Sequence, residues 1–169
     1  MTDKQSARIA FIGAGNMATA LVGGMLARGF TPDRVTLTDI STERLDMLAR
    51  QYGVKVTTDN AAAAADADVI LFAVKPQQMA EVCTALAPVV RARKPLVVSS
   101  AAGTTIAKLQ GWLGQDTAVV RCMPNTPALV QAGATGLYAS PQVSDAQRTL
   151  AHAMLDAVGI ALWLDAEDQ

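Results

Sequence analysis

Residues 8–21 read RIAFIGAGNMATAL, and this stretch decides the fold. An apolar run over 8–12 is followed by Gly13 and Gly15, and then by a segment typical of a helix. Two glycines at a strand-to-helix junction have two explanations. They form a tight turn that other residues cannot make, or they leave the backbone bare for contact with a ligand.

Apolar runs and helical segments alternate along the rest of the chain. The patterns predict strands at 8–12, 34–38, 54–58, 68–74, 95–100, 117–123, 133–140 and 160–164. They predict helices at 17–28, 41–51, 60–67, 76–90, 105–113 and 144–158, with Ser41 or Thr42 and Ser144 as N-caps. The run over 68–74 lacks polar alternation, which is typical of a strand covered on both faces in a parallel sheet. The sequence therefore predicts an α/β fold with a doubly wound, mainly parallel sheet and helices on both faces.

Composition favours one compact domain over residues 1–169. Hydrophobic residues make up 51% of the chain and charged residues 17%, and the formal net charge is −1. These values argue against disorder and give no electrostatic reason to expect nucleic acid or a membrane as partner. Cys83 and Cys122 lie far apart without metal-ligand spacing, so we expect free thiols, no metal and a cytoplasmic location.

The glycines of the opening stretch belong to a longer pattern. Gly13, Gly15 and Ala18 form G-x-G-x-x-A between a predicted strand and a predicted helix, and Asp39 ends the second strand. A carboxylate about 20 residues after such a motif is placed to accept hydrogen bonds from an adenosine ribose. The combination favours dinucleotide binding over a bare turn. An S-adenosylmethionine fold is the nearest rival, but Asn16 and Met17 add no further glycine to support it.

Three later stretches follow the fourth, fifth and sixth predicted strands. They read AVKPQ at 73–77, SSAAG at 99–103 and RCMPNTPA at 121–128. Each alone is explained as an ordered turn, and Lys75 as a solvated charge. The carboxyl ends of parallel strands meet at one edge of a sheet, so their shared position favours a site.

The segments FIGAGNMA, AVKPQ, VVSSAAG and RCMPNTPALV resemble, in order and spacing, those of pyrroline-5-carboxylate reductases. The resemblance covers essentially the whole chain. It implies a Rossmann-type dinucleotide-binding domain over 1–169, followed in the family by a helical dimerisation and substrate domain that this chain lacks. It implies reduction of 1-pyrroline-5-carboxylate, a cyclic imino acid, to L-proline by hydride transfer from NADPH or NADH, the last step of proline biosynthesis.

The resemblance also implies which residues contact the cofactor. They are Gly13, Ala14, Gly15, Asn16, Met17, Asp39, Asn60, Ala73, Val74, Lys75, Pro76, Ser100, Ala101, Ala102 and Asn125, with Asn125 near the nicotinamide. Family members that take NADPH often carry a small polar residue at the position of Asp39. A carboxylate there repels a 2′-phosphate and leans toward NADH, whereas Ser41, Thr42 and Arg44 nearby could accommodate it. The cofactor expected is therefore NADP or NAD.

No residue is assigned a catalytic role. His152 and Cys122 are interpreted as packing or surface residues, and Asp165, Glu167 and Asp168 as a solvated acidic end. We expect the full-length protein to be a homo-oligomer, and this chain alone to be inactive and a monomer or weak dimer. Two other functions stay open: a related hydroxy-acid dehydrogenase domain, and a dinucleotide-binding module without turnover.

Overall fold

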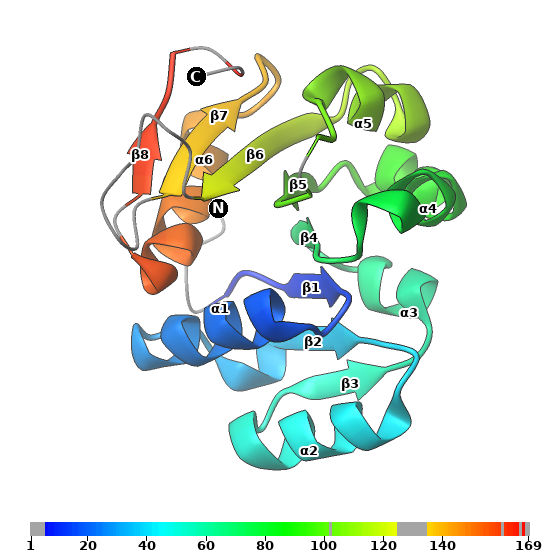
Figure 1. The fold of residues 1–169 in the computed structure, drawn as a ribbon, viewed down its shortest axis with the longest axis vertical. Helices are drawn as coiled ribbons and strands as arrows, with labels where there is room; N and C mark the ends of the chain where they lie inside the picture. The colour runs from blue at the N-terminus through cyan, green and yellow to red at the C-terminus, as the bar shows by residue number, and fades with distance from the viewer. Residues whose placement is uncertain (1–5, 102, 125–134, 160, 166, 168–169) are drawn as a thin grey trace.

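A computed structural model describes residues 6–101, 103–124, 135–159, 161–165 and 167 (Figure 1). The strands are β1 (Ile9–Ile12), β2 (Val35–Thr38), β3 (Lys55–Thr57), β4 (Val69–Phe72), β5 (Leu96–Ser99), β6 (Ala118–Pro124), β7 (Thr135–Ala139) and β8 (Ala161–Trp163). The α-helices are α1 (Asn16–Ala27), α2 (Thr42–Tyr52), α3 (Asn60–Ala64), α4 (Met79–Arg93), α5 (Ile106–Leu113) and α6 (Asp145–Leu155). Three short 3-10 helices complete the described elements: η1 (Pro32–Arg34), η2 (Pro76–Gln78) and η3 (Asp156–Val158).

The strands form one eight-stranded sheet in the order β3-β2-β1-β4-β5-β6-β7-β8. Neighbouring strands are parallel from β3 through β6, β7 is antiparallel to β6, and β8 is parallel to β7. The predicted fold class, a doubly wound and mainly parallel sheet, is confirmed.

The predicted elements agree closely with the observed ones. Ser41 caps α2 by accepting a hydrogen bond from the Arg44 amide at 3.2 Å. Ser144 caps α6 in a reciprocal capping box with Gln147. Pro76 opens the 3-10 turn η2 rather than α4 itself, and α4 continues to Arg93, beyond the predicted end.

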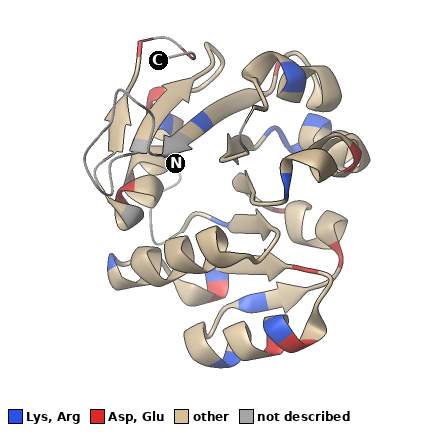
Figure 2. Cartoon of the chain, viewed as in Figure 1, with Lys and Arg blue, Asp and Glu red and all other residues tan. Residues whose placement is uncertain are grey.

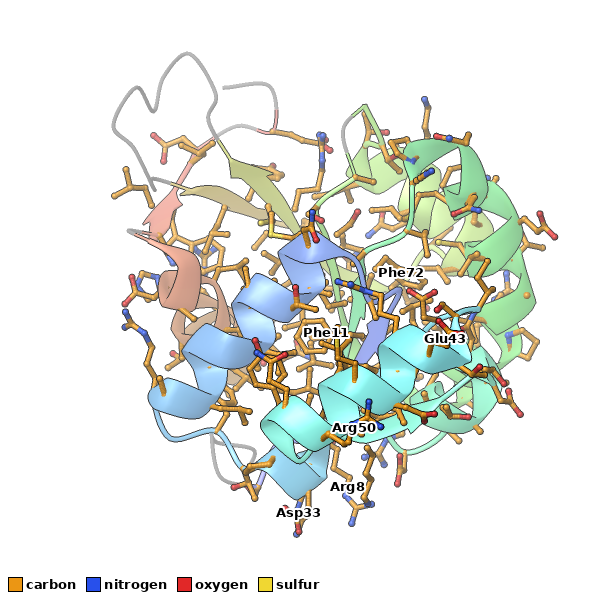
Figure 3. The ribbon with its side chains drawn as sticks, turned by 60° about the horizontal axis from the view of Figure 1, so that its bottom comes forward. Arg8, Phe11, Asp33, Glu43, Arg50 and Phe72 are labelled. Carbon is orange, nitrogen blue, oxygen red and sulfur yellow. The ribbon has the colours of Figure 1, made fainter. Side chains whose placement is uncertain are left out.

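Two hydrophobic layers cover the two faces of the sheet. Phe11 belongs to the layer formed with α1, α2 and α6, whereas Phe72 belongs to the layer formed with α3, α4 and α5. Both side chains lie inside the molecule, between sheet and helices (Figure 3). Because strand side chains alternate between faces, each buried strand contributes to both layers, which explains its unbroken apolar sequence.

The close packing of α1 against η3 depends on Gly24, a residue that no sequence pattern indicates. A Cβ atom on Gly24 in α1 would lie 2.5 Å from the Ala157 carbonyl oxygen of η3. The backbone of η3 therefore rests directly on α1, and only glycine leaves room for it.

Charged side chains lie mainly on the outer surfaces of the helices and at the strand ends. Figure 2 shows basic and acidic residues interspersed on α2, rather than separated into one patch. Within the described ranges, no helix is long and apolar enough to cross a bilayer.

Candidate functional site

The carboxyl ends of five parallel strands are level with one another. The sheet register pairs Ile12 with Thr38 and with Phe72, Thr38 with Thr57, and Phe72 with Ser99. The connections that follow these strands therefore leave the sheet at one edge. β1 lies between β2 and β4, at the point where the strand order reverses, and this is where open α/β sheets bind ligands.

Gly13 is needed for the turn itself. Its φ of +101° lies in the region that glycine favours, and its amide donates to the Thr38 carbonyl oxygen at 3.1 Å. A Cβ atom here would lie 2.7 Å from the Ala73 carbonyl oxygen. The connections after β1 and β4 thus pack backbone against backbone, and the tight-turn explanation holds for this glycine.

Neither backbone conformation nor close packing against the described residues requires a glycine at position 15. Its backbone is extended, with φ −76° and ψ −169°, and any residue can adopt this conformation. A Cβ atom here would meet no atom of the described residues within 4 Å. Gly15 is the N-cap of α1, and among the described residues no side chain caps the helix and its first turn has no acidic residue. The missing side chain leaves open space at the positive end of a twelve-residue helix, which suits an anionic ligand.

Asp39 and Arg44 hold the turn between these glycines. The two Asp39 carboxylate oxygens accept hydrogen bonds from the Ala14 amide and the Ser41 amide, each at 3.1 Å. Arg44 Nε donates to the Ala14 carbonyl oxygen. Beside them Ile40 exposes 97% of its surface, an unusual apolar exposure at the end of β2. Opposite charges thus lie together next to the glycine-rich turn.

The other predicted contact residues that the structure describes occupy the same edge. Ala73 donates to the Ile12 carbonyl oxygen at 2.8 Å, and exposed Lys75 precedes η2. Ser100 and Ala101 follow β5, and the Ala101 amide donates to Ser99 Oγ at 3.3 Å. Asn60 opens α3, after β3. Ala102 and Asn125 lie outside the described residues.

One prediction about the chain's end is wrong. Glu167 was expected to be solvated, but Arg121 Nη1 lies 2.9 Å from its Oε2 and the Ile106 amide donates to the same oxygen at 2.7 Å. No local pattern indicates this contact, because the three residues are far apart in the sequence. The fold alone brings them together at the carboxyl edge.

The remaining candidate side chains lie in packed environments. His152 stacks on Trp163, with ring centroids 6.4 Å apart, and Arg148 lies over the same indole. Burial raises the pKa of both the Cys83 and the Cys122 thiols to about 12, so both stay protonated at neutral pH. No three His, Cys, Asp or Glu side chains gather as a metal site in the part of the chain that the structure describes.

A polar cavity of about 500 Å³ lies away from this site. It is lined by residues including Arg8, Asp33 and Arg34, near the amino ends of the strands. Arg8 and Asp33 are at the end of the molecule opposite the glycine-rich turn (Figure 3). The cavity is thus lined mainly by residues near the amino ends of the strands, together with Thr57 at the carboxyl end of β3, and does not include the glycine-rich turn.

Comparisons with known proteins agree with the predicted resemblance. A pyrroline-5-carboxylate reductase of Pseudomonas aeruginosa is 53% identical over 162 residues, covering 96% of this chain and 59% of that protein. One from Vibrio alginolyticus is 40% identical over 160 residues, covering 95% of this chain and 58% of that protein. A solved pyrroline-5-carboxylate reductase of Coxiella burnetii superposes with a TM-score of 0.90 at 44% identity, covering 96% of this chain and 60% of that one.

The chain thus spans about three fifths of the length of these curated relatives. A family model for NADP oxidoreductases described as coenzyme F420-dependent matches residues 8–103. More than half of the chain lies within this match, which includes the glycine-rich turn, the connections after β2, β3 and β4, and the first part of the connection after β5. The chain therefore belongs to the coenzyme F420-dependent NADP oxidoreductase family.

Proposed function

We propose that this chain is the dinucleotide-binding part of a pyrroline-5-carboxylate reductase, which reduces 1-pyrroline-5-carboxylate to L-proline with NADPH or NADH. The observation that carries the proposal is the open space at Gly15, next to the uncapped start of α1. A pyrophosphate fits such a place, because it accepts hydrogen bonds from the first helix amides and is stabilised by the helix dipole.

The rest of the cofactor has a place along the same edge. In the proposal the turn from Gly13 to Met17 lies against the pyrophosphate, which the amides of Gly15 to Met17 hold, because the Gly13 and Ala14 amides already donate to Thr38 and Asp39. Asp39 with Asn60 lies on the adenosine side. The connections 73–76 and 100–102, together with Asn125, lie on the nicotinamide side. The bound nicotinamide supplies the hydride for the C=N carbon of the cyclic imine. The chain's own residues bind and orient, and no described side chain is assigned as acid or base.

Names of relatives favour this reaction over the alternatives. The pyrroline-5-carboxylate reductase of Pseudomonas aeruginosa matches at 53% identity. A prephenate dehydrogenase of Aquifex aeolicus superposes with a TM-score of 0.75 at only 14% identity, which supports a common fold and nothing more. A pyrroline carboxylate reductase of Plasmodium falciparum, 23% identical with a TM-score of 0.79, is described with NADP bound. We therefore rank a hydroxy-acid dehydrogenase domain and a binding module without turnover below the reductase.

We further propose that residues 1–169 act with a second, helical domain of the kind the resemblance implies. The chain covers only 59% of the Pseudomonas aeruginosa relative. In this view the second domain completes the substrate pocket and dimerises the protein. By itself this chain then binds the cofactor but lacks the groups that hold the imine close to it, and such positioning contributes several kcal/mol to catalysis.

A chimera tests the function. Residues 1–169 replace the matching part of the Pseudomonas aeruginosa relative, and the oxidation of NADPH or NADH is followed with 1-pyrroline-5-carboxylate. We expect the chimera to turn over at a rate comparable to that of the relative, and the isolated chain to bind the cofactor without appreciable turnover.

Two outcomes would contradict the proposal. A folded chimera that binds the cofactor but does not reduce the imine would refute the proposed substrate. Turnover by the isolated chain at the rate of the chimera would refute the need for a second domain. Hydroxy acids with NADP⁺, assayed in parallel, test the dehydrogenase alternative.

A further inference from the structure

The Glu167 carboxylate joins three separate parts of the chain at the carboxyl edge. Its Oε2 accepts from the amide of Ile106, the first residue of α5, at 2.7 Å, and lies 2.9 Å from Nη1 of Arg121 in β6. Glu167 itself follows β8. The two side chains of this pair are 13% and 27% exposed, against 51% and 41% for Arg28 and Asp156. The contact is thus better shielded from water than a typical surface ion pair.

These contacts lie next to the connection between β5 and α5, of which Ala102 is outside the described residues. The connection begins after Ser99, which pairs with Arg121 in the sheet, and ends at Ile106. Ser99 Oγ holds its near end through the Ala101 amide, and Glu167 holds its far end. The first turn of α5 has no acidic residue of its own, so Glu167 supplies the negative charge at the positive end of this helix.

The sheet order decides which half of a dinucleotide this connection meets. β5 lies beyond β4 on one side of β1, and Asp39 follows β2 on the other. A cofactor whose pyrophosphate rests on the turn after β1, with its adenosine toward Asp39, extends over β4 and β5 with its nicotinamide half.

We propose that Glu167 is a positioning residue, which fixes the β5–α5 connection so that the connection can receive the nicotinamide half of the cofactor. The inference rests on the proposed function. Neutralising Glu167 removes the ion pair and the charge at the start of α5 and leaves one uncharged oxygen to accept from Ile106, so the far anchor of the connection is weakened. Gly15 follows β1 and Asp39 follows β2, and both strands lie on the other side of β4 from this connection. The adenosine half of the cofactor therefore keeps its contacts.

Two ligands distinguish contacts to the nicotinamide half of the cofactor from contacts to the adenosine half. They are NADPH, and 2′-phospho-ADP-ribose, which lacks the nicotinamide. Their dissociation constants are measured by calorimetry for the wild-type chain and for Glu167→Gln, with folding checked by far-UV circular dichroism. We expect Glu167→Gln to weaken NADPH binding about tenfold and 2′-phospho-ADP-ribose binding less than about twofold, where tenfold corresponds to about 1.4 kcal/mol. Asp156→Asn, which neutralises the exposed partner of Arg28, is the matched control and should change neither constant.

A loss of overall stability does not produce this pattern. If Glu167→Gln fails to fold, Glu167→Asp replaces it, since a shorter carboxylate cannot reach both Arg121 and Ile106 and should give the same selective loss. Equal weakening of both ligands, or of neither, in a folded variant would overturn the inference alone. A wild-type chain that binds neither these ligands nor NADH would overturn the proposed function as well.

Discussion

Asp39 and Arg44 contact the same residue, Ala14, and carry opposite charges at the place where the adenosine ribose is proposed to lie. Asp39 uses both carboxylate oxygens on backbone amides, so it builds the turn whichever cofactor binds. Its charge still opposes a 2′-phosphate, while Arg44 favours one. The preference between NADPH and NADH should therefore depend on this pair.

Two substitutions test these charges. Asp39→Asn keeps the size of the side chain but only one acceptor oxygen for the two amides, and it should raise the affinity for NADPH relative to NADH about tenfold, or about 1.4 kcal/mol. Arg44→Gln should shift the same ratio in the opposite direction. Asp39→Ser is a poorer test, because it also shortens the side chain. Calorimetric titrations with the two cofactors give the ratio. An unchanged ratio in both variants would contradict the assignment.

The two buried cysteines lead to a separate prediction about the pH dependence of stability. Burial raises the pKa of Cys83 and Cys122 from 9.0 to about 12, so the folded chain keeps two protons that the unfolded chain releases above pH 9. The thiol contribution to stability is complete below pH 9 and is lost as the pH rises toward 12. At pH 8 a thiol reagent should modify both cysteines only after unfolding in denaturant. Rapid modification of the native chain would show that the thiols are accessible.

At the level of the secondary-structure elements, α4 ends at a residue whose backbone conformation is unfavourable for a side chain other than hydrogen. Its C-cap, Lys94, has a φ of +56°, a left-handed conformation that costs a residue with a side chain. α2 ends in a similar way at Gly53, with φ +72° and no strain. Lys94→Gly should therefore raise the free energy of unfolding by about 0.5–1 kcal/mol, and Gly53→Ala should lower it by a similar amount. Urea unfolding measures both. Lys94→Ala, which removes the charge and keeps the strain, should bring no gain.

Sequence patterns predict these elements well where the signal is local. Ser41 and Ser144 are correct as N-caps because a cap bonds an amide only three residues away. The resemblance also indicates the residues of the carboxyl edge. What the sequence does not indicate comes from distant contacts: the packing of Gly24 on Ala157, and the bonds of Glu167. Such contacts exist only once the sheet has brought together segments far apart in the chain.

For the whole molecule, strand direction depends on what connects consecutive strands. The change from parallel to antiparallel occurs between β6 and β7, where no helix is predicted between the two strands, unlike the helix-containing connections between the earlier strands. A strand's own residues do not record the direction of its neighbour. The part that binds the cofactor in our proposal is the parallel half, β3 through β6, where the alternation of strand and helix predicts the topology directly.

The central claim for the whole molecule is that a dinucleotide lies across this half, with its pyrophosphate in the space that Gly15 leaves open. Gly15→Val tests it directly, since the backbone at Gly15 accepts valine and no atom of the described residues lies within 4 Å of the new Cβ. Gly111→Val in α5, also in open space, is the matched control. The measurement is the calorimetric dissociation constant for NADPH or NADH, whichever the wild-type chain binds more tightly. We predict at least about 100-fold weaker binding by Gly15→Val, equivalent to about 2.7 kcal/mol, with native far-UV circular dichroism and no change for the control. Wild-type affinity in a folded Gly15→Val chain would contradict the account.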